Sequence, residues 1–209
     1  MKKLLALLLA LAMVFSMAAC TSSSNQGGGE EGGGDEPVVA SDKWIRIGMD
    51  MTNLNTLDVF DSDYNEVLQV SDAIFDRLYN KNKDTLELEP CLLAEMPTVS
   101  EDGLTYTCRL RDDVKWSDGT PLTAKDVEFT LNYFYGKDTA SDNTWVTELI
   151  KGCLEMEAGE SDYLEGFKLI DDYNFEITLY QPYGIYEATM ATSYMAILPA
   201  HIRPNYGDE

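Results

Sequence analysis

Hydrophobic and polar residues alternate over residues 104–110, and the spacing becomes helical further along. Every second residue of that stretch is apolar, which is the period of a strand with one buried face. Ser117-Asp118-Gly119 then supplies turn residues, because Asp can bond its own backbone and Gly tolerates positive φ. Thr123 and Asp126 have the spacing of a capping box, and apolar residues recur at helical spacing up to Phe134. The pattern predicts a strand, a turn and a helix, in that order.

The segments on both sides predict a mixed α/β chain. The predicted elements are a first strand over residues 44–49, a helix over residues 67–78, a second helix over 144–156, a hairpin of residues 167–170 and 175–179, and a helix over 184–192. In the helix over 67–78 the apolar stripe is Val67, Val70, Ile74 and Leu78. Residues 79–89 are expected to be a polar connection with edge-strand character. The chain is long enough to bury one core.

The first twenty residues have the pattern of a secretory signal. Two lysines precede an apolar run over residues 4–15, which is too short for a comfortable membrane span. Ala18-Ala19 directly before Cys20 resembles a bacterial lipoprotein cleavage box. Cys20 is therefore expected to be lipidated and to anchor the chain to the membrane, the alternative being an ordinary signal cleaved nearby. Residues 21–40 are expected to form a disordered tether rich in Gly, Ser and Glu, because they offer too little apolar surface to offset the entropy of ordering.

Charge excludes one broad class of partner. The chain has 15 basic and 37 acidic residues, for a net charge of −22. Nucleic-acid binding needs clusters of Lys and Arg to meet phosphates, and the sequence contains none. The same negative charge argues against binding of the protein surface to an anionic bilayer. An acidic surface most often serves to keep a protein soluble.

Cysteine and histidine content limits the chemistry. After Cys20 come Cys91, Cys108 and Cys153, which permit one disulfide with one thiol left over, or three thiols. Their spacings match no zinc site, and His201 is the only histidine. Neither a metal, a cofactor nor a Ser–His–Asp or Cys–His catalytic arrangement is expected, and His201 is interpreted as an exposed or hydrogen-bonded residue near a helix start.

A family resemblance rests on residues 102–131, which read DGLTYTCRLRDDVKWSDGTPLTAKDVEFTL. This segment resembles the extracytoplasmic solute-binding proteins, family 5, that serve oligopeptide, dipeptide and nickel ABC importers. The resemblance continues upstream in Leu88-Glu89-Pro90 and Leu93-Ala94-Glu95 and downstream in residues 197–202. It departs at Asp113, where the family usually has Gly, and at Cys91 and Cys108, where Ala and an aromatic residue are common.

The resemblance implies an α/β (mixed α+β) fold of the type II periplasmic-binding-protein kind, present in part. By it, residues 41–57 begin the first lobe, residues 58–181 form an extra mixed α/β subdomain, and residues 182–209 return to the first lobe. The second lobe is expected to be absent. The chain is then a fragment that is expected to bind ligand poorly by itself.

The resemblance also suggests which loops face a ligand cleft. These are Thr52-Asn53, Ser62-Asp63-Tyr64-Asn65 and Ser193-Tyr194. Amides there could hydrogen-bond a peptide backbone, Tyr64 and Tyr194 could stack, and Asp63 could meet an amino group. Ordinary turn chemistry and helix capping are the alternative for each residue. Trp116 and Trp145 could also stack on a ligand, but Trp116 belongs to the shared segment and is expected in the core.

These observations favour a receptor over an enzyme. The leading hypothesis is a monomeric, lipid-anchored, extracytoplasmic protein that captures a peptide or similar solute for the permease of an ABC importer. A secreted hydrolase is the runner-up, which the lack of a nucleophile motif disfavours. A surface protein that uses this subdomain for contacts with other proteins is the third alternative.

Overall fold

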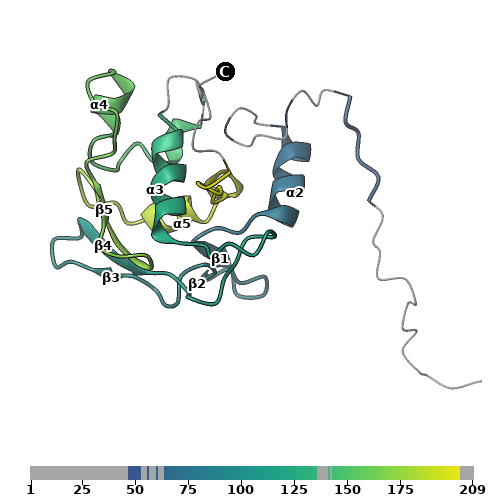
Figure 1. The fold of residues 1–209 in the computed structure, drawn as a ribbon, viewed down its shortest axis with the longest axis horizontal. Coiled ribbons are helices and arrows are strands. Elements are labelled where there is room, and N and C mark those ends of the chain that lie inside the picture. Colours follow the sequence, from purple (N-terminus) through teal and green to yellow (C-terminus); the bar gives the residue numbers. More distant parts are fainter. Residues whose placement is uncertain are drawn as a thin grey trace, which may run out of the picture. The chain divides into compact units, whose positions relative to one another are not determined.

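A computed structural model of the 209-residue chain describes residues 47–52, 56, 60, 64–135, 141 and 143–202. The predicted signal, the tether and Cys20 lie outside these residues. Within them the elements are mixed, with α2 (Asn65–Ile74) followed by strands and then by α3 (Ala124–Tyr133) and further short elements (Figure 1). None of the helices described is long and apolar enough to cross a membrane.

The central element is a four-stranded antiparallel sheet in the order β3-β4-β6-β5. Its strands are β3 (Thr98–Val99), β4 (Thr105–Arg109), β5 (Phe167–Leu169) and β6 (Asn174–Thr178). Tyr106 lies opposite Ile177, and Cys108 lies opposite Phe175, so the buried positions of β4 and β6 face the same side of the sheet. The predicted strand over residues 104–110 and the predicted hairpin are confirmed.

A second, two-stranded sheet pairs β1 (Tyr79–Lys81) with β2 (Leu88–Pro90). Asn82 closes the turn between them, because its Oδ1 accepts the backbone N–H groups of Asp84 at 2.9 Å and Thr85 at 3.1 Å. The edge-strand character predicted for residues 79–89 is therefore confirmed, as an antiparallel hairpin.

The helix α3 starts as predicted. Its capping box is complete: the backbone N–H of Thr123 donates to Asp126 Oδ2 at 2.7 Å, and the Thr123 side chain accepts from the Asp126 backbone. The buried residues of α3 belong to the same core cluster as those of the four-stranded sheet, and α3 contacts β5. Local sequence signals were sufficient here, because a cap needs partners only three residues apart.

Two predicted elements in the first part of the chain are wrong in part. Residues 47–49, the described part of the strand predicted over 44–49, are not in a strand, and Ile47 is 75% exposed. They pair with none of the described strands. The helix over 67–78 ends at Ile74, which is 63% exposed, because the chain straightens so that Leu78 enters the core ahead of β1.

The helix over 144–156 is split by Gly152. It becomes η2 (Thr144–Val146), a turn, and α4 (Cys153–Glu157). Gly152 has φ of 95°, and a Cβ there would lie 2.4 Å from the Glu165 backbone nitrogen. The last predicted helix, over 184–192, is present as the shorter α5 (Tyr186–Met190), followed by η3 (Ser193–Met195).

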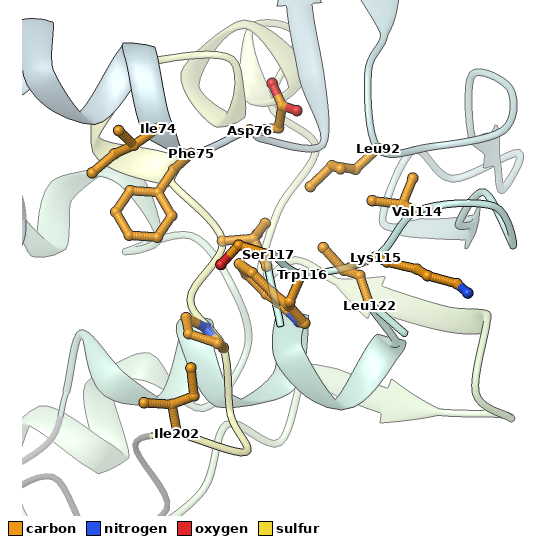
Figure 2. Close-up of a pocket in the computed structure, with 12 residues that line it drawn as sticks. Ile74, Phe75, Asp76, Leu92, Val114, Lys115, Trp116, Ser117, Leu122 and Ile202 are labelled. Atoms are coloured by element: carbon orange, nitrogen blue, oxygen red, sulfur yellow. The ribbon is translucent and has the colours of Figure 1, made fainter. Parts of the chain in front are cut away.

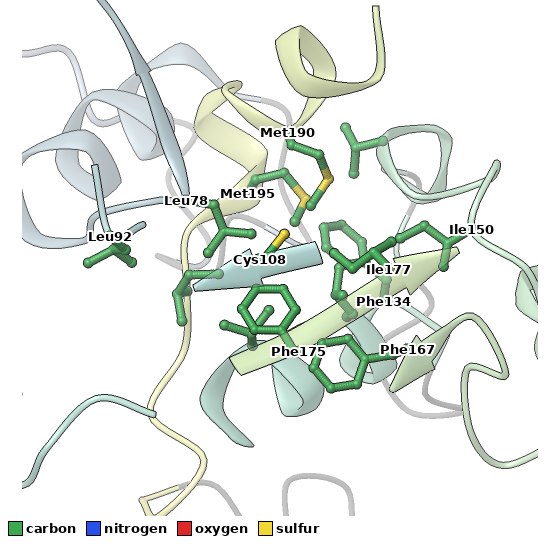
Figure 3. Close-up of a cluster of buried hydrophobic side chains, with 14 of the residues drawn as sticks. Leu78, Leu92, Cys108, Phe134, Ile150, Phe167, Phe175, Ile177, Met190 and Met195 are labelled. Carbon is green, nitrogen blue, oxygen red and sulfur yellow. The ribbon is translucent and has the colours of Figure 1, made fainter. Parts of the chain in front are cut away.

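The hydrophobic core is one cluster that joins both sheets to α3 and α5. Figure 3 shows the Cys108 side chain among Leu78, Met195 and the aromatic side chains of β5 and β6. Cys91, Cys108 and Cys153 are all free thiols, so the alternative with three thiols holds. Burial raises the pKa of Cys108 to about 12. Trp116 packs against the core, as expected for a structural residue.

Candidate functional site

Five of the eight predicted binding residues lie in the described part of the chain. They are Thr52, Tyr64, Asn65, Ser193 and Tyr194. The predictions for Asn53, Ser62 and Asp63 fall outside it, as does the lipidation prediction for Cys20.

Thr52 and the start of α2 are exposed. The backbone N–H of Thr52 donates to Asp50 Oδ1 at 3.0 Å, and its hydroxyl donates to the same oxygen, which lowers the pKa of Asp50. This is the turn chemistry that was the alternative for Thr52. Tyr64 occupies the cap position of α2 without a capping bond from its side chain, and Asn65 is the first residue of the helix.

Ser193 and Tyr194 lie in η3, which packs against α2. The Ser193 hydroxyl donates to Asp72 Oδ2 at 3.0 Å. Asp72 also pairs with the Arg77 guanidinium, and Arg77 Nη1 donates to the Ala191 carbonyl at 3.4 Å. We call these residues, Asp72, Arg77 and Ser193, the carboxylate clamp. It joins the end of α2 to a turn more than a hundred residues further along the chain.

The Tyr194 ring meets the Trp145 ring nearly at a right angle. The ring centroids are 5.9 Å apart and the planes cross at 76°, which is the favourable edge-to-face arrangement. Trp145 is 46% exposed, whereas Tyr194 is half-buried against the core. We call these two residues the aromatic corner. Trp145 was only a tentative candidate from the sequence, because nothing local showed that it would meet Tyr194.

The turn that carries Trp145 is hydrogen-bonded to Tyr135, which lies just after α3. The Tyr135 hydroxyl lies 2.9 Å from Thr147 Oγ1, and Thr147 Oγ1 donates to the Thr144 carbonyl at 3.2 Å. Burial of the Tyr135 phenol raises its pKa. These hydrogen bonds hold in place the turn from which the exposed indole of Trp145 projects.

A cavity lies at the end of α2. It has a volume of about 410 Å³ and lies between residues 74–76, the loop that carries Trp116, and residues 197–202. Figure 2 shows apolar walls, with Lys115 extending its ammonium away from the other labelled side chains. None of the predicted binding residues that the structure describes lines this cavity.

His201 ties two of the segments beside this cavity together. Its Nε2 lies 2.8 Å from Asp118 Oδ2. The pKa of Asp118 is lowered to about 2, first by the Thr120 backbone N–H and then by the His201 side chain. This contact gives the only histidine of the chain a structural role. Among the residues described, no group of three or more His, Cys, Asp or Glu side chains could hold a metal ion.

Comparison with known proteins adds an independent result. The family model described as bacterial extracellular solute-binding proteins, family 5 Middle, matches residues 87–209. The chain is 33% identical over 119 residues to a dipeptide-binding protein of Lactococcus lactis subsp. cremoris, covering 56% of this chain and 22% of that protein. It is 30% identical over 173 residues to a glutathione-binding protein of Escherichia coli (strain K12), covering 81% of this chain and 30% of that protein.

Solved structures agree with these relatives. Listeria monocytogenes OppA bound to peptide matches with a TM-score of 0.67 and 29% identity, over 73% of this chain and 30% of that one. The pheromone receptor PrgZ matches with a TM-score of 0.67 and 27% identity, over 72% of this chain and 30% of that one. The chain therefore spans less than a third of the length of these relatives.

Proposed function

Because the chain belongs to the bacterial extracellular solute-binding proteins of family 5, we propose that it captures a peptide or a similar small solute outside the cytoplasm and delivers it to the permease of an ABC importer. Its fold is part of the type II periplasmic-binding-protein fold. The observation that carries the proposal is the combined match, in sequence and in fold, to proteins that bind dipeptides and oligopeptides.

The ligand face of this chain is proposed to include the aromatic corner and the loops named from the sequence. Ser193 and Tyr194 are favoured by their rigid support, because the carboxylate clamp fixes η3 on α2. Thr52, Asn53 and residues 62–65 complete the proposed face. Aromatic surface beside a few hydrogen-bonding groups is the usual lining of small-ligand sites.

The proposed mechanism needs no chemical step. A ligand that binds better between two closed lobes than between open ones shifts the population toward the closed form. The 209 residues span less than a third of the length of the relatives, so by themselves they are expected to contact part of a bound peptide and to bind it weakly, with a Kd on the order of 1 mM. No enzymatic role is proposed.

The experiment is a titration of the 209-residue chain with defined tripeptides, followed by NMR, with a turnover assay on the same peptides. Weak saturable binding without cleavage supports the proposal. Cleavage of the peptides would identify a hydrolase instead. Absence of any binding at peptide concentrations of about 10 mM, roughly tenfold above the expected Kd, would refute the proposed ligand class for this chain.

We propose that Cys20 carries a lipid anchor and that the protein acts as a monomer. The support is the sequence before Cys20, in which an apolar run ends in two alanines. Cys20→Ala is expected to abolish both lipid labelling and membrane retention in a bacterial host. Retention and labelling that survive the substitution would contradict the anchor.

A further inference from the structure

The aromatic corner places an exposed indole directly beside a second ring. Trp145 keeps 46% of its surface exposed although a half-buried tyrosine lies beside it. The nearly perpendicular rings form two walls that meet at an angle, and both walls are rigid because each ring has only two side-chain torsions. A third ring placed in the angle can stack on one wall and meet the other edge-on.

The charges beside the corner are balanced. Asp72 is the carboxylate behind η3, and the Arg77 guanidinium already neutralises it. Arg77 also donates to the Ala191 carbonyl, three residues before Tyr194. Because Arg77 already pairs with Asp72, this carboxylate is not available to an ammonium or guanidinium group of a ligand, and the geometry of the two rings remains the feature that selects the ligand group.

The two walls come from different parts of the chain and are fixed separately. Trp145 is part of η2. Thr147, which follows η2, is hydrogen-bonded to Tyr135 and to the Thr144 carbonyl. Tyr194 is part of η3, which the hydrogen bond from Ser193 to Asp72 connects to α2. Losing that bond weakens the attachment of η3 to α2, although the Ile197 N–H still donates to the Asp76 carbonyl. The bonds of the turn that carries Trp145 stay intact, so Asp72 can be tested as a residue that acts through Tyr194.

We propose that the aromatic corner of Trp145 and Tyr194 is a subsite for an aromatic side chain of the bound peptide, with Asp72 as the positioning residue that holds Tyr194 against Trp145. This inference rests on the function proposed above and specifies its ligand. An aromatic contact of this kind contributes about three- to tenfold in affinity.

The experiment compares Ala-Phe-Ala, Ala-Leu-Ala, Ala-Arg-Ala and Ala-Ala-Ala as ligands of the full chain labelled with 5-fluorotryptophan. The three tryptophans give separate fluorine signals, which are assigned by single substitutions. We expect Ala-Phe-Ala to bind about three- to tenfold more tightly than Ala-Leu-Ala, and to shift the Trp145 signal more than the Trp116 signal.

Trp145→Leu is expected to bring the ratio of the dissociation constants of Ala-Leu-Ala and Ala-Phe-Ala down to about one, whatever its effect on the affinity for either peptide. Trp145→Phe should restore part of the preference, which shows that a ring is needed. Tyr163→Leu removes another exposed tyrosine and serves as the matched control with no expected effect.

Ser193→Ala and Asp72→Asn are expected to reduce the preference without abolishing binding, whereas Asp84→Asn, at an exposed ion pair, should have no effect. A merely structural role for Asp72 would weaken all four peptides equally, and that result would overturn its assignment as a positioning residue.

The outcomes separate the two proposals. If peptides bind but show no preference for the aromatic ring, or prefer arginine, or keep the preference in Trp145→Leu, the subsite is wrong and the binding function stands. If no tripeptide binds, both the binding function and the subsite fall.

Discussion

Replacing Asp126 by Asn is expected to lower the free energy of unfolding by roughly 3 kcal/mol. Asp126 is 4% exposed, and its two oxygens serve two different segments. Oδ2 accepts the Thr123 backbone N–H at 2.7 Å and completes the cap of α3. Oδ1 accepts the Ala200 backbone N–H at 2.9 Å and so fastens residues 197–202 to the same helix.

The magnitude follows from the number of acceptors. An amide has one oxygen, so Asn can replace only one of these bonds, and its NH2 group would face the other N–H donor. Losing one hydrogen bond to a charged group costs about 1.5–3 kcal/mol, and the remaining bond weakens because the charge is gone. Each kcal/mol shifts the Tm of a chain this long by about 2–4 °C, so a fall of about 6–12 °C is expected.

The assay is urea unfolding of the full chain, with hydrogen exchange of the Ala200 amide as the local measurement. Asp112→Asn, at an exposed aspartate, is the control and should stay within about 0.5 kcal/mol of wild type. Faster exchange at Ala200 is expected in Asp126→Asn. A variant whose stability lies within about 0.5 kcal/mol of wild type would refute the reasoning that Asp126 joins the two segments.

Three further predictions concern single sites. Gly152→Ala should destabilise the fold by roughly 2 kcal/mol or more in urea unfolding, because φ is positive and the new Cβ would meet the Glu165 backbone; an unchanged midpoint would contradict the clash. Cys108 should resist iodoacetamide at pH 8 until the protein unfolds, since burial raises its pKa to about 12; native-state labelling at the rate of an unfolded thiol would disprove this. The lowered pKa of Asp118, about 2, stabilises the fold above the ordinary aspartate pKa of about 3.8, and this stabilisation is lost as pH falls through about 2. The urea midpoint should therefore fall less steeply over that pH range in Asp118→Asn than in wild type, and parallel pH profiles would count against the assignment.

Much of the fold followed from short-range patterns in the sequence. Alternation predicted β4 and the hairpin of β5 and β6, and the spacing of Thr123 and Asp126 predicted the start of α3. The shared segment over residues 102–131 predicted the family. These features depend on residues a few positions apart, or on an extended motif, and both can be read directly along a chain.

The remaining features depended on distant parts of the chain. Ile74 fits a helical stripe, yet α2 ends there and the backbone is extended from Phe75, which brings Leu78 into the core ahead of β1. The predicted helix over 144–156 is interrupted at residues 147–152, where Gly152 has a positive φ and lies close to the Glu165 backbone. The aromatic corner joins Trp145 to Tyr194, which are 49 positions apart, and the Ser193–Asp72 bond of the carboxylate clamp joins residues 121 positions apart. The periodicity of a sequence shows which face of an element is apolar, but packing decides which residues meet across that face, and so only the tertiary structure assembled the candidate site.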